Sequence, residues 1–123
     1  MITFEELKER TTHEIIKKMV ELAEGFEFID GAFARIKYSV TEKYANGYID
    51  GFAFPLLLYR AVDGWNKKNL CKPIQILCNC ISFITDEDEP ASIEWGYDNE
   101  QYQPCHLTQC EMAILDCLIE VLK

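Results

Sequence analysis

The chain has 123 residues with 49% hydrophobic and 12% aromatic content, which excludes a disordered protein and fits a single domain over residues 1–123. Its formal net charge is −9, and such an acidic chain is unsuited to bind nucleic acid or anionic lipid. The longest apolar stretch, Phe52–Tyr59, has eight residues, too few to span a membrane. Because the start, MITFEELKER, lacks the features of an export signal, we expect a cytoplasmic protein.

The net negative charge comes from one half of the chain. Residues 1–72 hold eleven acids and eleven bases, whereas residues 73–122 hold ten acids and no Lys or Arg. We expect these carboxylates to form a continuous negative face that contacts a basic protein partner. The alternative is that they only keep an otherwise apolar half of the chain soluble.

A long amphipathic helix is predicted near the N-terminus, over residues 4–24. Thr3 and Glu6 have the spacing of a capping box, and Gly25 is placed as a typical C-terminal glycine. Apolar residues recur between them at helical spacing. The sequence therefore predicts one continuous helix.

Three strands are predicted next, over residues 26–29, 32–40 and 48–54, separated by the turn dipeptides Asp30-Gly31 and Asn46-Gly47. The following segment has two interpretations.

Residues 55–63 fit either a helix or an edge strand. Pro55 at a first helical position and Gly64 after the last one would frame a short helix, whereas the aromatic and aliphatic run also fits a strand. We favour the strand, followed by a polar loop over residues 64–73.

The strongest strand signal covers residues 74–85, which are apolar on both faces, so we expect a central strand covered on two sides. The acidic residues 86–89 and Pro90 reverse the chain, and residues 91–97 return as the next strand.

The last helix is predicted from Thr108, which forms a second capping box with Glu111, to the C-terminus. It is apolar around most of its circumference, so either the N-terminal helix or a second chain must cover it, and we expect a homodimer through this helix. The predicted fold is α+β: an antiparallel β-meander of about 4–5 strands packed with an N-terminal and a C-terminal helix.

The residues best suited to contact a partner lie around the last hairpin. Adjacent carboxylates repel one another unless they are solvated or countered by cations, so we expect the acidic run at an exposed tip. The partner-binding residues predicted from the sequence are Asp86, Glu87, Asp88, Glu89, Glu94, Asp98 and Tyr97. A solvated turn without a partner is the alternative.

All six cysteines also lie in the second half of the chain. In a reducing cytosol they pack as small hydrophobic residues, which is the interpretation we favour. A structural zinc site would have to use Cys78, Cys80, Cys105 and Cys110, whose spacing differs from the usual C-x(2–4)-C pairs. We therefore predict no metal and no cofactor.

A catalytic thiol is the remaining chemical candidate. Cys110 would lie in the first turn of the last helix, where the helix dipole lowers a thiol pKa, with His106 or His13 as the base. No oxyanion donor or orienting third residue can be identified, so the sequence favours a protein without enzymatic activity. We expect a protein-binding factor, a small acidic inhibitor or immunity-type protein acting on a basic partner surface. The alternatives are a structural zinc-binding protein and a thiol-dependent enzyme.

Overall fold

The structure, a computed structural model of the chain, describes residues 3–28, 34–36, 44–45, 54–95 and 107–123. The helices in this part of the chain are α1 (Phe4–Arg10), α2 (His13–Leu22), α3 (Phe54–Lys68) and α4 (Gln109–Leu122). The strands are β1 (Phe26–Phe28), β2 (Ala34–Ile36), β3 (Tyr44–Ala45), β4 (Gln75–Ile76), β5 (Cys80–Ile84) and β6 (Pro90–Glu94). No helix among these residues is both long and apolar enough to cross a membrane.

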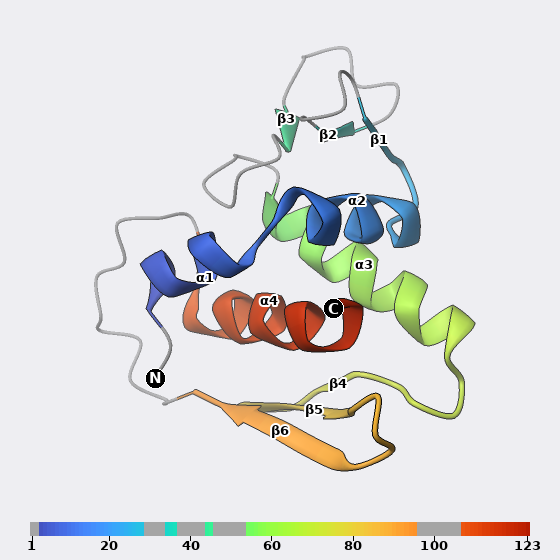
Figure 1. Cartoon of the computed structure of the whole chain (residues 1–123), viewed down its shortest axis with the longest axis vertical. Helices are drawn as coiled ribbons and strands as arrows, with labels where there is room; N and C mark the ends of the chain where they lie inside the picture. Colours follow the sequence, from blue (N-terminus) through green and yellow to red (C-terminus); the bar gives the residue numbers. More distant parts are fainter. Residues whose placement is uncertain (1–2, 29–33, 37–43, 46–53, 96–106) are drawn as a thin grey trace.

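The α+β class is confirmed, but the single meander of 4–5 strands is not. The described strands form two separate antiparallel sheets of three strands each, in the orders β1-β2-β3 and β4-β5-β6. In Figure 1 the first sheet lies beyond α2 and α3, and the second lies on the far side of α4. Helices therefore separate strands that the sequence analysis placed in one sheet.

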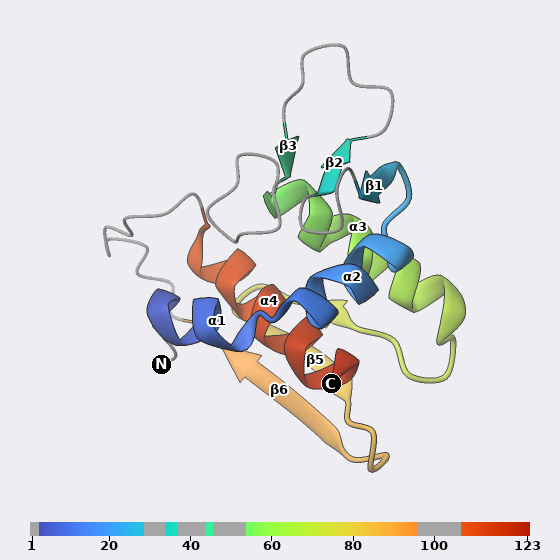
Figure 2. The same ribbon diagram turned by 45° about the horizontal axis from the view of Figure 1, so that its top comes forward.

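The C-terminal helix α4 occupies the centre of the molecule, between a layer of helices and the β4-β5-β6 sheet (Figures 1 and 2). It contacts α1, α2 and α3 as well as β5 and β6. Leu115 and Leu118 are fully buried in it, and Ile114 is fully buried beside them. Burying each such side chain contributes roughly 1.5–3 kcal/mol relative to exposure. The apolar circumference that suggested a homodimer is thus covered within the chain, and dimerisation remains an untested prediction.

The predicted N-terminal helix is two helices. Thr3 caps α1, as expected, but the helix ends at Arg10 and Thr12 caps α2, accepting a hydrogen bond from the Ile15 N–H. The apolar positions continue in phase across the break, so periodicity alone did not reveal it. Gly25 adopts a left-handed φ of 88° just beyond the end of α2, which matches its expected role in ending the helix.

The strand favoured over residues 55–63 was wrong, because these residues belong to α3 (Figure 1). The helix begins with Phe54 and Pro55, and proline is well tolerated in a first helical turn. Its buried residues have the i, i+3, i+4 and i+7 spacing of one helical face: Phe54, Leu57, Leu58, Ala61 and Val62. Gly64 does not end the helix. It lies where a Cβ atom would be 1.9 Å from the Leu22 carbonyl oxygen, so only glycine allows α2 and α3 this close approach.

The single strand expected over residues 74–85 was also wrong. A tight turn divides it into β4 and β5, which pair with each other, and the Leu77 N–H donates to the Cys80 carbonyl at 2.8 Å across this turn. Asn79, a residue that favours turns, lies within it. On β5, Ile81 and Phe83 are buried toward α4, while the alternate residues are only half-buried.

Side chains of α3 fix the start of the second sheet. The Asn66 side-chain amide accepts a hydrogen bond from the Ile74 N–H at 2.7 Å and donates one to the Ile74 carbonyl at 3.0 Å. The Trp65 indole N–H donates to the Lys72 carbonyl at 2.9 Å. These bonds anchor the residue next to β4 and, as shown below, place Lys72 beside the acidic turn.

Candidate partner-binding site

The acidic run Asp86–Glu89 forms the turn of the β5–β6 hairpin, and all four residues are exposed. Backbone bonds define the turn: the Thr85 N–H donates to the Glu89 carbonyl at 2.9 Å, and the Asp88 N–H donates to the Thr85 carbonyl at 3.0 Å. Asp88 has a φ of 63°, which an aspartate accepts more easily than most residues. The turn thus presents its carboxylates from a defined backbone rather than from a long loop.

One base forms an ion pair with this turn among the described residues. Lys72 Nζ is 2.6 Å from Asp88 Oδ1. In the described part of the chain Asp86, Glu87 and Glu89 form no ion pair. The turn therefore keeps a concentrated negative charge.

The other predicted partner-binding residues lie along or beyond β6. Glu94 is exposed at the end of that strand opposite the turn. Tyr97 and Asp98 lie outside the described residues, as do residues 29, 32–33, 37–40 and 48–53 of the predicted middle strands. The structure therefore brings Glu94 onto the same hairpin as the turn and leaves Tyr97 and Asp98 unassigned.

The acids of the second half of the chain do not form the single negative face that we expected. On α4, Asp116 and Glu120 both pair with Arg10 of α1, at 2.9 and 2.6 Å, and Lys123 lies 3.2 Å from Glu120. Arg10 is 106 residues away from Asp116 in the sequence, so counting charges by segment could not reveal this neutralisation. Among the described acids of this half, Asp86, Glu87 and Glu89 of the turn, Glu94 of β6 and Glu111 of α4 form no ion pair with a described base.

The cysteines do not assemble into a metal centre within the described residues. No group of three or more His, Cys, Asp or Glu side chains there could hold a metal ion. Cys78 is exposed in the β4–β5 turn, Cys80 is half-buried on β5 and Cys110 is half-buried on α4, while Cys105 lies outside the described residues. Nothing among these residues supports the zinc alternative.

The sequence analysis expected the dipole of the last helix to lower the pKa of Cys110, but burial raises that pKa. Partial burial raises the pKa of the Cys110 thiol, although a hydrogen bond with Tyr59 lowers it. Burial, together with the charges of Cys110 and Glu111, raises the pKa of Tyr59 to about 12. A raised pKa is unfavourable for a nucleophilic thiol, which reacts as the thiolate.

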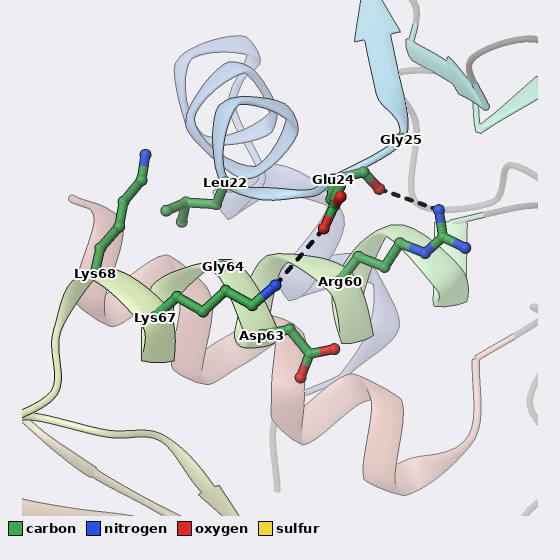
Figure 3. Close-up of a pocket in the computed structure, with 8 residues that line it drawn as sticks. All are labelled: Leu22, Glu24, Gly25, Arg60, Asp63, Gly64, Lys67 and Lys68. Carbon is green, nitrogen blue, oxygen red and sulfur yellow. Dashed lines mark hydrogen bonds and ion pairs between the residues drawn. The ribbon is translucent and has the colours of Figure 1, made fainter.

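A hollow of about 550 Å³ lies between α2 and α3, and the sequence analysis did not predict it. Figure 3 shows that Arg60 and Lys67 of α3 both reach Glu24, just beyond the end of α2. The Arg60 guanidinium donates to the Glu24 carbonyl at 3.1 Å, and Lys67 Nζ lies 3.6 Å from the Glu24 carboxylate. Lys68 points away from this group (Figure 3). Arg60 and Lys67 of α3 thus both bind Glu24, the residue that follows the C-cap of α2.

Comparison with known proteins found no protein-family model, no curated protein and no solved structure that matches this chain.

Proposed function

We propose that this chain is a non-enzymatic protein-binding factor, a small acidic inhibitor or immunity-type protein that acts on a basic partner surface. The observation that carries the proposal is the exposed acidic turn Asp86–Glu89, in which only Asp88 pairs with a base among the described residues. Neighbouring carboxylates that lack counter-charges attract cations strongly. A basic protein surface would supply those counter-charges on binding.

The second element of the proposed site is Glu94, which extends the negative charge along β6. Tyr97 and Asp98 belong to the proposal from the sequence alone. We further propose a cytoplasmic protein that does not bind nucleic acid, because its surplus charge has the sign of a phosphate backbone. The homodimer stays part of the proposal, although the apolar surface of α4 that motivated it is buried within the chain.

A thiol enzyme is not proposed, because the pKa of Cys110 is raised and a protonated thiol reacts slowly. A structural zinc-binding protein stays the alternative from the sequence, and Cys105, one of its four candidate ligands, lies outside the described residues.

Association kinetics with a basic probe test this proposal. The variant neutralises the turn with side chains of nearly the same shape: Asp86→Asn, Glu87→Gln, Asp88→Asn and Glu89→Gln. The probe is a decapeptide of lysine, and its on-rate is measured over a range of salt concentrations. We expect slower association and a flatter salt dependence, because long-range attraction sets both quantities.

The matched control removes the same amount of charge from the helices, through Glu5→Gln, Glu9→Gln, Glu14→Gln and Glu21→Gln, all at exposed positions. If both variants slow association equally, only net charge matters and the turn is not a binding site. An on-rate that is unchanged in the turn variant would contradict the proposal directly.

A further inference from the structure

The outer edge of β6 is a strand edge that no described residue pairs with. β6 is a terminal strand of the β4-β5-β6 sheet. The Thr85 N–H donates to the Glu89 carbonyl, and the Trp95 N–H donates to the Asn79 carbonyl, both at 2.9 Å. Because antiparallel pairs alternate between bonded and non-bonded positions, the backbone groups of Pro90, Ser92 and Glu94 point away from β5, toward the edge.

The backbone and the charges of this edge favour some added strands over others. Pro90 has no N–H to offer, and proline and charged residues on an edge strand oppose unspecific pairing. Ser92 and Glu94 still present a donor and an acceptor each. Their side chains are exposed, and the acidic turn lies at the Pro90 end of the strand. An acidic strand would be repelled at both ends of this edge, by Glu94 and by the acidic turn, whereas a basic strand would be attracted.

A small groove lies beside the same strand. It has a volume of about 90 Å³, and its apolar lining comes from Ile93 and Trp95 on one side and from Met112 and Ala113 of α4 on the other. Ile93 is directed to the α4 side of the sheet, opposite to Ser92 and Glu94. A residue placed next to Ile93 on an added strand would therefore direct its side chain toward this groove.

We propose that the β6 edge binds an extended basic segment of the partner as an added β-strand. A Lys or Arg lies opposite Glu94, a small apolar residue lies opposite Ile93 and enters the groove, and further bases follow toward Asp86–Glu89. This inference rests on the proposed function and adds the mode of binding to it. A second copy of this chain is an unsuitable occupant, since its own β6 edge would bring Glu94 and the acidic turn against their equivalents.

A peptide with methylated backbone nitrogens tests the proposal on the unaltered protein. The probe is a decapeptide of alternating Lys and Val, which favours an extended chain, and binding is measured by titration at low salt. When the peptide adds antiparallel to β6 with lysine opposite Glu94, the lysine N–H groups face β6 and the valine N–H groups face away. We expect N-methylation of the lysines to weaken binding about tenfold or more, and N-methylation of the valines to weaken it less than about threefold.

The matched test on the protein uses Ser92→Pro, which removes the outward N–H, and Ser92→Ala, which keeps it. Proline is tolerated at an edge position whose N–H faces solvent. We expect Ser92→Pro to weaken peptide binding about tenfold and Ser92→Ala less than about twofold. Should Ser92→Pro fail to fold, as judged by circular dichroism, the two methylated peptides decide alone.

The outcomes separate this inference from the proposed function. If the two methylated peptides bind equally while neutralising the acidic turn still weakens binding, attraction is purely electrostatic, and added-strand binding is wrong although the proposed function stands. If neutralising the turn has no effect either, both are wrong. If the protein self-associates through this edge and Ser92→Pro abolishes that association, a second copy is the occupant and the inference is overturned.

Discussion

The helix α4 and the β5–β6 turn both carry acids from the half of the chain that lacks bases. The acids of α4 form ion pairs with another helix, whereas the acids of the turn are exposed to solvent. On α4, Asp116 and Glu120 pair with Arg10, and the Asp116 side chain is only 15% exposed. In the turn, the Asp88 side chain is 74% exposed even though it pairs with Lys72. Acids on α4 thus contribute to the attachment of α1, whereas acids of the turn face solvent. A surplus of charge in a segment therefore does not by itself define a charged surface.

The largest expected effect on the free energy of unfolding comes from the buried side chains of α4. Leu118→Ala removes a fully buried side chain from the centre of α4 and should lower the free energy of unfolding by about 2–5 kcal/mol. Urea denaturation measures it. Val121→Ala, at a half-buried position of the same helix, should cost less. Equal costs at both positions would mean that α4 is not the central element.

The ion pairs of Arg10 should have the next largest effect. Arg10→Met keeps an apolar stem but leaves Asp116 and Glu120 without their shared base, at a cost of about 1–2 kcal/mol, between the values for exposed and buried pairs. A double-mutant cycle with Asp116→Asn isolates the coupling in denaturant melts. If the losses of stability of Arg10→Met and Asp116→Asn simply add in the double variant, the two side chains are not coupled. The acids of α4 would then contribute no more to stability through Arg10 than the acids of the turn do.

A pH-dependent loss of stability should arise from Cys117 of α4. Burial, followed by the charges of Asp116 and Glu120, raises the pKa of this thiol above its ordinary value of 9.0. Above that pH the unfolded chain releases the thiol proton while the folded chain keeps it, so the free energy of unfolding falls as pH rises, by about 1 kcal/mol between pH 9 and 10. Tyr59, with a pKa of about 12, adds a loss in the same direction above pH 10.

Denaturant melts at several pH values compare Cys117→Ala with Cys71→Ala, an exposed cysteine. The Cys117 variant starts less stable but should show a shallower decline above pH 9, while the Cys71 variant should keep the decline of the unaltered protein. If the free energy of unfolding fell equally with pH in the unaltered protein and in both variants, Cys117 would not retain its proton in the folded chain.

The acidic turn should show the smallest effect on stability. Neutralising Asp86, Glu87, Asp88 and Glu89 with Asn or Gln should change the free energy of unfolding by less than about 0.5 kcal/mol, because these side chains are exposed. Asn at position 88 accepts the left-handed φ. Thermal melts of the same variant used for association kinetics measure it. A loss above about 1 kcal/mol would mean that the turn acids maintain the fold.

The sequence by itself determined the features that depend on neighbouring residues. The Thr108–Glu111 capping box forms as predicted, with both of its hydrogen bonds present, because its two residues lie three positions apart. The cap of α1 by Thr3 and the reversal of the chain at residues 86–90 are equally local. The candidate acidic turn could be found for the same reason, since its four carboxylates are adjacent in the chain.

Only the tertiary structure decided which apolar runs became helix and which acids were neutralised. Residues 55–63 fit two periodicities, and packing of α3 against α2 and α4 selected the helix. Residues 74–85 formed a hairpin because β5 could pair on both of its edges, with β4 and β6. Arg10 meets Asp116 across 106 residues of sequence. Such contacts join residues that are far apart in the sequence, so patterns among neighbouring residues cannot predict them.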